Sequence, residues 1–355
     1  MRKLVATAPR VAELRDYQER PIAMDEVRVK VEFASPKHGT EIADFRGSTP
    51  FIDGKFDPEW HIFREREADE PRGIEFGDLP LGNMFVGRII EVGSGVSEYA
   101  LGDRVCSYGP IMETQVVKAV NNYKLRKMTR NASVKNAVCY DPAQFALGAV
   151  RDGNVRPGDN VVVIGLGAIG QIAAQLAAKL GASVVIAVDP IGSRRDIAIK
   201  HGAHYALDST NCDVGLEIKK MTDKLGADVI IETSGNVQAL QSALRGLAYG
   251  GTISYAAFPK PFPEGLWLGQ EGHFNNGRII FTRAGSEPNP DYPRWSRKRI
   301  EDVCWNMLMN GYLDCEDIIT PVVRFEESDE GFCKYVDRQP ELSIKLGVVF
   351  GGEKQ

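Results

Sequence analysis

The pattern of apolar residues changes twice along the chain. In the first part, up to about residue 143, apolar and polar positions alternate, most regularly in Glu26–Phe33, where every second residue is apolar. A period of two predicts strands with one buried face. Met84–Val92 and Arg104–Tyr108 are further predicted strands, each next to a glycine-containing turn. We therefore expect a small, mostly antiparallel β domain here.

In the middle of the chain, short apolar runs alternate with segments of helical length. The strand-like runs are Val161–Ile164, Val184–Val188, Val229–Ile231, Thr252–Ala256 and Ile279–Phe281. The helical segments between them are Gly170–Leu180, Arg194–His201, Asp213–Lys224 and Asn236–Leu247. Gly181, Gly202 and Gly226 follow three of these segments and predict helix ends. The alternation predicts an α/β fold, with a parallel, doubly wound sheet and helices on both faces.

The last part of the chain is again mixed. Ile300, Cys304 and Leu308 fall on one helical face, and a short strand, a helix and a final strand at Ile344–Phe350 follow. We expect the β-rich domain to be built from residues 1–143 and 286–355. The α/β domain then comprises residues 144–285.

Composition and charge exclude several classes of protein. The 355 residues suggest two domains at about 150 residues each. A net charge of −5 disfavours nucleic acid as a partner. The N-terminal apolar run is too short for a signal peptide, and Val161–Gly170 is too short to cross a bilayer. The six cysteines show no CxxC spacing, so we expect reduced thiols in a cytoplasmic protein that does not bind membranes.

The clearest motif is a glycine pattern between a predicted strand and a predicted helix. Gly165, Gly167 and Gly170 form GxGxxG, with Ala168 and Ile169 at the helix start. The first glycine permits a tight turn, the second lets a diphosphate approach the backbone, and the third lets helix and strand pack closely. Free N–H groups at the helix start favour an anion. The motif predicts a dinucleotide site.

An acidic residue supports this interpretation. Asp189 ends the second strand of the predicted sheet, 22 residues after Gly167. A carboxylate there accepts hydrogen bonds from the ribose and repels the additional phosphate of NADP, so we expect NAD. Arg194 would weaken that preference. In the alternative interpretation, Asp189-Pro190 caps the next helix and Arg194 lies on the exposed face of that helix.

Several motifs resemble the medium-chain dehydrogenase/reductase family, whose familiar members are zinc-type alcohol and polyol dehydrogenases. They are GDRV, ETSGNVQALQSAL, GGTIS and the terminal IKLGVVF. The resemblance implies a Rossmann domain plus a β-rich, GroES-like catalytic domain. It also implies a homo-oligomer, a dimer or tetramer, and places Thr233 and Ser234 near the coenzyme. The alternative for Thr233 and Ser234 is a plain turn between strand and helix.

Longer motifs resemble a bacterial subgroup of this family that oxidises carbon 3 of hexopyranosides. They are KLVATAPRVAEL, PKHGTE, NNYKLRKM, NAVCYDPAQFA, HFNN and SEPNPDYPRWSRKRIE. The resemblance implies an oxidoreductase that transfers a hydride to NAD from a secondary hydroxyl of a sugar or glycoside. Gulosides and glucosides are the expected substrates.

The zinc-binding motifs of these relatives are altered here. They align with His38-Gly39-Thr40-Glu41, Gly82-Asn83-Met84 and Asp141-Pro142. A catalytic zinc needs about three nitrogen, sulfur or carboxylate ligands, and Asn83 offers only an amide. We therefore expect a site without zinc. If zinc is bound, His38 and Asp141 are its expected ligands.

Without a metal, side chains must take the hydroxyl proton and hold the oxygen. His38 is the favoured base, Lys37 could hold the oxygen or itself be the base, and Thr40 matches the hydroxyl relay position of alcohol dehydrogenases. Asp141 could orient His38 or bind a sugar hydroxyl. The alternatives are a buried structural histidine, a solvated lysine, and Asp141 as the N-cap of a helix that continues with Pro142.

The segment 48–81 is longer than in shorter relatives and rich in aromatic residues. We interpret it as a wall or lid over the substrate, or alternatively as a solvated insertion. Trp60, Asn83 and Tyr140 are candidates for sugar contacts.

Three other functions fit these features. They are a zinc-dependent polyol or alcohol dehydrogenase, a zinc-free enone or quinone reductase, and an NAD-binding regulatory protein without catalysis. The reductase would favour NADPH, against which Asp189 argues.

Overall fold

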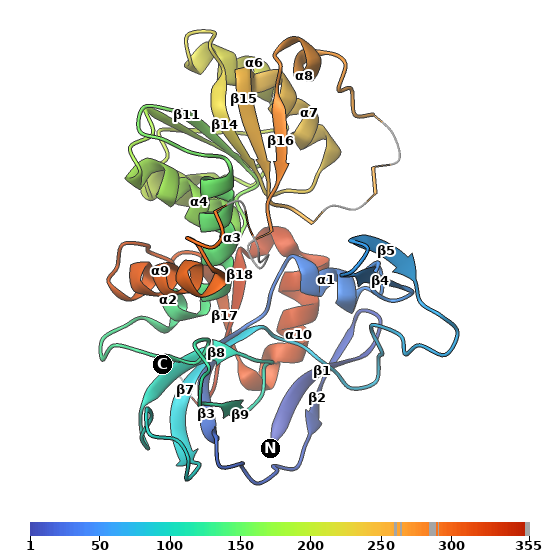
Figure 1. The fold of residues 1–355 in the computed structure, drawn as a ribbon, viewed down its shortest axis with the longest axis vertical. Coiled ribbons are helices and arrows are strands. Elements are labelled where there is room, and N and C mark those ends of the chain that lie inside the picture. The colour runs from blue at the N-terminus through green and yellow to red at the C-terminus, as the bar shows by residue number, and fades with distance from the viewer. Residues whose placement is uncertain (259–260, 263–264, 284–288, 290, 352–355) are drawn as a thin grey trace. The chain divides into compact units, whose positions relative to one another are not determined.

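The computed structural model describes residues 1–258, 261–262, 265–283, 289 and 291–351. The chain divides into two compact units. The terminal unit comprises Met1–Val134 and Ile319–Gln355, and the central unit comprises Lys135–Ile318. Figure 1 shows both units and labels many of their elements.

A six-stranded parallel sheet forms the centre of the central unit. Its strands are β11 (Asn160–Ile164), β12 (Val184–Val188), β13 (Tyr205–Leu207), β14 (Ala227–Glu232), β15 (Leu247–Tyr255) and β16 (Arg278–Phe281). Their spatial order is β13-β12-β11-β14-β15-β16, with every neighbouring pair parallel. This is the 3-2-1-4-5-6 order of Rossmann folds, which confirms the predicted fold class.

Helices cover both faces of this sheet (Figure 1). They are α3 (Tyr140–Asp152), α4 (Ala168–Lys179), α5 (Gly192–Lys200), α6 (Val214–Met221), α7 (Val237–Gly246) and α8 (Glu271–Phe274). The chain enters the central unit within α2 (Val134–Val138), and α9 (Arg297–Met309) packs against α3. Apolar side chains of α6 and α7 pack on one face, around Ile230 and Ile253. On the other face, Ser254 Oγ donates to the Ala149 carbonyl of α3 at 2.8 Å.

The predicted helix ends are confirmed at two glycines. Gly181 and Gly202 follow α4 and α5 with φ of +87° and +111°, a region that glycine enters without steric cost. The helix predicted to reach Lys224 ends earlier, at Met221. Thr222 ends it, because its hydroxyl donates to the Ile218 carbonyl and accepts from Gly226 N, both at 2.8 Å.

The terminal unit is β-rich. Its strands are β1 (Arg2–Ala8), β2 (Val11–Asp16), β3 (Glu26–Ser35), β4 (Gly54–Asp57), β5 (Ile62–Glu65), β6 (Leu79–Pro80), β7 (Met84–Val92), β8 (Arg104–Tyr108), β9 (Thr114–Lys118), β10 (Arg126–Lys127), β17 (Ile319–Arg324) and β18 (Lys345–Val349). The largest sheet has the order β10-β8-β7-β3-β18-β17, and β9 also pairs with β3. The smaller sheets are β2-β1-β6 and β4-β5. All neighbours are antiparallel except β17 and β18.

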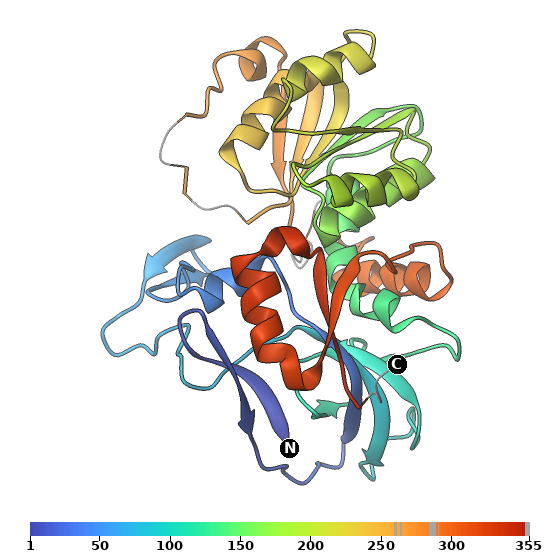
Figure 2. The same ribbon diagram turned by 180° about the vertical axis from the view of Figure 1, so that it is seen from behind.

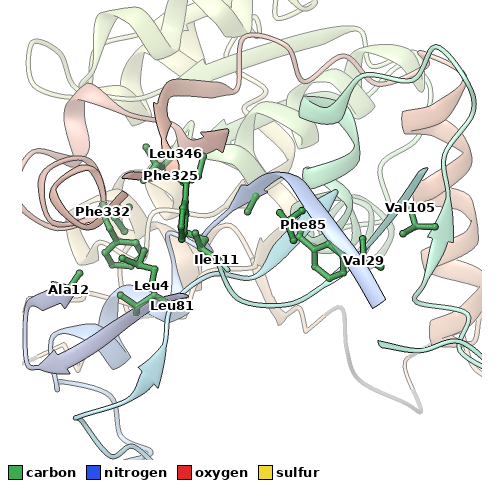
Figure 3. Close-up of a cluster of buried hydrophobic side chains, with 14 of the residues drawn as sticks. Leu4, Ala12, Val29, Leu81, Phe85, Val105, Ile111, Phe325, Phe332 and Leu346 are labelled. Carbon is green, nitrogen blue, oxygen red and sulfur yellow. The ribbon is translucent and has the colours of Figure 1, made fainter. Parts of the chain in front are cut away.

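Both ends of the chain build the core of the terminal unit. Its helical segments are α1 (Thr40–Phe45), η1 (Phe325–Glu327), α10 (Ser328–Phe332), η2 (Cys333–Arg338) and η3 (Pro340–Leu342). Phe332 packs edge-to-face on Phe45, with ring centroids 4.9 Å apart. Figure 3 shows Phe325, Phe332 and Leu346 together with Leu4 and Ile111 in one apolar cluster. In Figure 2 the red helical segment beginning at α10 lies beside the blue strands β1 and β2.

The two units differ from the predicted domain boundaries. The chain passes from one to the other between residues 134 and 135 and between 318 and 319, not at 143 and 144. The physical reason is that α9 packs against α3, so both helices belong to the central unit. The other predicted boundary, between residues 285 and 286, lies outside the described residues. Among the residues described, no helix has the length and apolar character to cross a membrane.

Candidate active site

The glycine turn of the central unit follows β11. Gly165 has a φ of +89°, and a Cβ there would lie 2.8 Å from Ser234 N. A Cβ at Gly170 would lie only 1.9 Å from the Gly165 carbonyl oxygen. At Gly167, by contrast, a Cβ would meet no described atom within 4 Å. The first and third glycines are therefore needed for packing, whereas the second borders open space.

The start of α4 supplies hydrogen-bond donors to that space. Gly167 is the N-cap, and Ala168 and Ile169 form the partly exposed first turn. Within the described chain no side chain caps this end, and first-turn N–H groups have no partner inside a helix. Strand order also reverses between β11 and β14, which places the turn at the switch point of the sheet. The site therefore fits the diphosphate of a dinucleotide.

Asp189 is buried directly after β12, with 3% of its surface exposed. Its Oδ2 accepts from Leu166 N at 2.7 Å, and its Oδ1 accepts from Ile191 N at 2.9 Å. The carboxylate thus joins the glycine turn to the chain before α5. Each oxygen keeps a further lone pair for a ribose hydroxyl. The alternative of Asp189 as a helix cap fails in detail, because Ile191 is the N-cap of α5.

Arg194 lies in the first turn of α5, with Nη1 3.8 Å from Asp189 Oδ2. Its backbone carbonyl accepts from Gln171 Nε2 at 2.7 Å. Gln171 is fully buried one residue after the glycine motif. Arg194 is therefore connected to the glycine turn through Gln171, and its guanidinium lies beside Asp189, the carboxylate that disfavours the additional phosphate of NADP.

Thr233 and Ser234 lie at the carboxyl end of β14, close to the turn. Thr233 Oγ1 donates to the Gly165 carbonyl at 2.6 Å. Both the backbone N–H and the hydroxyl of Ser234 donate to Glu232 Oε1. Burial raises the pKa of Glu232, and the donors from Ser234 and Gly235 partly offset that. The Thr233 hydroxyl thus stabilises the glycine turn, and the Ser234 hydroxyl stabilises the end of β14.

The candidate catalytic loop of the terminal unit is tied to the last strand. His38 Nε2 accepts from Leu346 N at 2.9 Å, across 308 positions of sequence. A neutral ring that accepts at Nε2 carries its proton on Nδ1. The neighbouring Lys345 is buried, and its Nζ donates to the Pro36 carbonyl at 2.5 Å. Strand β18 therefore positions Lys37 and His38, just before Thr40 begins α1.

Glu41 connects this loop to the second altered motif. Its Oε2 accepts from Lys37 N at 2.6 Å, and its Oε1 accepts from Gly82 N, next to Asn83. Burial raises the pKa of Glu41 to about 7. The N–H groups of Gly82 and Lys37 and the charge of Lys345 lower this pKa, but by less than burial raises it. We did not predict a role for Glu41 or Lys345. The available signals were the acid in the HGTE motif and a lysine within an apolar strand.

The substrate candidates of the terminal unit differ in exposure. Asn83 Nδ2 is buried and has no hydrogen-bond partner among the described residues. Trp60 follows β4 and is 73% exposed. Next to it, the rings of Phe56 and Phe63 pack edge-to-face at 5.5 Å. The hairpin β4-β5 therefore presents aromatic surface, and Asn83 holds a free amide donor.

The two candidates at residues 140 and 141 lie in the central unit, at the start of α3. The helix begins at Tyr140 after an N-cap at Cys139, so the alternative interpretation of Asp141 as the N-cap is wrong. Asp141 is buried in the first turn. Tyr140 is completely buried and its hydroxyl donates to Glu301 Oε2 at 2.7 Å. This corrects the interpretation of Tyr140 as a sugar contact, because its polar atom holds α3 to α9.

The described residues do not assemble a zinc ligand set. Among them, no three His, Cys, Asp or Glu side chains gather where they could hold a metal ion. His38 Nε2 already accepts from Leu346 N, and Asn83 presents an amide rather than an anionic or imidazole ligand. We therefore derive no step through a metal.

Comparison with known proteins decides the family. A family model described as zinc-binding dehydrogenase matches residues 168–289. D-guloside 3-dehydrogenase of Escherichia coli (strain K12) is 66% identical over 350 residues, covering 99% of this chain and 100% of that protein. The chain belongs to the zinc-type medium-chain dehydrogenase family. It is therefore an oxidoreductase of the dehydrogenase class, and the predicted family is confirmed.

Solved structures of other medium-chain dehydrogenases share the fold. 2R,3R-butanediol dehydrogenase from Bacillus subtilis has a TM-score of 0.77 at 19% identity, over 98% of this chain and 99% of that one. Galactitol-1-phosphate dehydrogenase from Escherichia coli has a TM-score of 0.76 at 19% identity, over 98% and 100%. These likenesses confirm the predicted architecture of a Rossmann sheet plus a separate β-rich unit.

Proposed function

We propose that this dehydrogenase oxidises a secondary hydroxyl of a sugar or glycoside with NAD, at carbon 3 of a hexopyranoside such as a guloside or glucoside. The observation that carries the proposal is the 66% identity to D-guloside 3-dehydrogenase, which extends over nearly the whole of both units. The similarity therefore covers both units rather than the dinucleotide-binding sheet alone.

NAD supplies the hydride acceptor when it is bound. The turn at Gly165–Gly170 would hold its diphosphate, and Asp189 its adenosine ribose. Asp189 keeps one lone pair on each oxygen for this and repels the phosphate that distinguishes NADP. Arg194, 3.8 Å away, weakens that repulsion, and so we expect a preference for NAD with residual use of NADP.

The terminal unit would supply the proton chemistry. His38 would be the base: once Nε2 leaves Leu346 N, this nitrogen can accept the hydroxyl proton, and the ring then carries a proton on both nitrogens. Lys37 would hold the developing alkoxide and Thr40 would relay the proton. Asn83 would donate its buried amide N–H to a sugar hydroxyl, and Trp60 would contact a ring face. Asp141 would bind a sugar hydroxyl or orient His38.

A zinc-dependent reaction is the second candidate, and the family description as zinc-binding dehydrogenases favours it. Metal analysis of active protein distinguishes the two. About one zinc per chain, with loss of activity on chelation, would replace the zinc-free proposal. Full activity after chelation, without bound metal, would support it.

The experiment that tests the function follows NADH formation by absorbance. Glucosides, gulosides and free polyols are compared, each with and without chelator. We expect turnover of hexopyranosides above that of polyols, and a His38→Ala variant that still binds NADH but turns over at least tenfold more slowly. No oxidation of any sugar would favour a regulatory NAD-binding protein. Full turnover by the variant would remove His38 from the mechanism.

Two further features belong to this proposal. None of the six cysteines, all of which the structure describes, forms a disulfide, and this supports a reducing compartment such as the cytoplasm. The edge strand β16 carries Phe281 with 79% of its surface exposed, which supports association of two or four copies through this edge. Light scattering at micromolar concentration tests the oligomeric state.

A further inference from the structure

Two polar side chains end neighbouring strands at the carboxyl edge of the central sheet. Glu232 of β14 and Tyr255 of β15 are register partners at the last paired position. Because the strands are parallel and in register, both side chains belong to the same sheet face as Ile230 and Ile253. Glu232 is fully buried and Tyr255 is 2% exposed. A carboxyl group and a phenol therefore lie together, away from water.

The hydroxyl of Tyr255 has no hydrogen-bond partner in the described chain. Its ring packs edge-to-face on Phe281, with centroids 5.7 Å apart, so the ring position is set by packing. No hydrogen bond joins the hydroxyl to Glu232, whose carboxylate accepts from Ser234 and Gly235. A buried polar group without a partner is costly and rare, which points to a partner that binds.

The strand order indicates which ligand group would reach this position. Asp189 follows β12, on one side of β11, while Tyr255 ends β15, on the other. Three strand spacings, about 14 Å, separate β12 from β15, and the glycine turn lies between them. A dinucleotide with its diphosphate at the turn and its adenosine at Asp189 extends its second nucleoside toward β14 and β15.

We propose that Tyr255 Oη hydrogen-bonds the nicotinamide nucleoside of the coenzyme. The proposal rests on the proposed function, since it assumes a nicotinamide dinucleotide at the glycine turn. Burial and the neighbouring Glu232 raise the pKa of Tyr255, so the phenol is neutral and can both donate and accept. Tyr255 is then a binding residue on the hydride-accepting half of the coenzyme, opposite Asp189.

The test is calorimetric titration of wild type and Tyr255→Phe with NADH, ADP-ribose and ADP. We expect the variant to bind NADH roughly three- to tenfold more weakly, the effect of one hydrogen bond, and to bind ADP as wild type does. Weaker binding of ADP-ribose as well would assign the bond to the ribose, and unchanged ADP-ribose binding to the nicotinamide. Equal NADH affinity, or equal weakening for ADP, would overturn the proposal.

A matched control is Tyr249→Phe, because Tyr249 lies on the same strand and is 77% exposed. It should leave all three affinities unchanged. In the free protein, Tyr255→Phe should leave the Tm unchanged or raise it, since it removes an unpartnered buried hydroxyl. A lowered Tm would mean that the hydroxyl has a partner inside the protein, which contradicts the inference. If wild type binds no NADH, the proposed function itself fails.

Discussion

The glycine turn of the central unit and the His38 loop of the terminal unit are built in opposite ways. The turn uses backbone shape, and most of its contacts come from residues 161–191 and the end of the adjacent strand β14. The loop uses side chains, and Lys345 and Leu346 hold it from more than 300 positions away. The comparison teaches that a coenzyme site can form from a local motif, while the loop needs the folded C-terminal strand.

The largest effect should come from Gly170→Ala. Its Cβ would lie 1.9 Å from the Gly165 carbonyl, so helix and strand must separate. We expect a loss of about 4 kcal/mol in the free energy of unfolding and no measurable NADH binding. Urea unfolding and calorimetry measure the two effects. A variant as stable as wild type would show that the turn tolerates rearrangement, and the contrast with the loop would disappear.

Lys345→Met tests the other side of the comparison. It removes the buried cation that donates to the Pro36 carbonyl and faces Glu41. We expect a loss of about 3 kcal/mol in the free energy of unfolding and a lower kcat. Lys30→Met, on the exposed side of β3, is the matched control and should have little effect. If the variant has a reduced kcat but an unchanged affinity for NADH, the His38 loop and the glycine turn act independently.

Glu41 predicts a pH dependence for the His38 loop. Burial raises its pKa from 4.5 to about 7, so the folded protein binds more protons than the unfolded chain between these values. The stabilising contribution is full below pH 4.5 and is lost as the pH rises through 7. Relative to Glu41→Gln, wild type should lose on the order of 2 kcal/mol between pH 4.5 and 8. Parallel stability curves would contradict this.

The smallest effect is expected for Gly167→Ala. The new methyl group meets no described atom within 4 Å, so the free energy of unfolding should change by less than about 1 kcal/mol. The methyl group would enter the space proposed for the diphosphate and weaken NADH binding about tenfold. Unchanged affinity would place the diphosphate elsewhere. Together with Gly170→Ala, this variant separates binding from packing within one motif.

Much of the central sheet could be predicted because its signals are local. Five of its six strands are apolar runs, and glycines end the helices between them. The strand Tyr205–Leu207 was not predicted, because three residues are too few to show a period. The start of α3 was also missed, since Asp141-Pro142 has the local pattern of a helix cap while packing against α9 begins the helix at Tyr140.

The order of residues alone was enough to indicate the parallel sheet, the dinucleotide turn and the family, because each depends on neighbours along the chain. Only the folded molecule shows that the Tyr140 hydroxyl donates to Glu301 and that Glu41 accepts hydrogen bonds from two motif loops. It also shows that His38 accepts a hydrogen bond from β18. Those contacts join positions far apart in sequence. Burial and hydrogen bonding in three dimensions, which no local pattern encodes, determine which polar atoms remain available for chemistry.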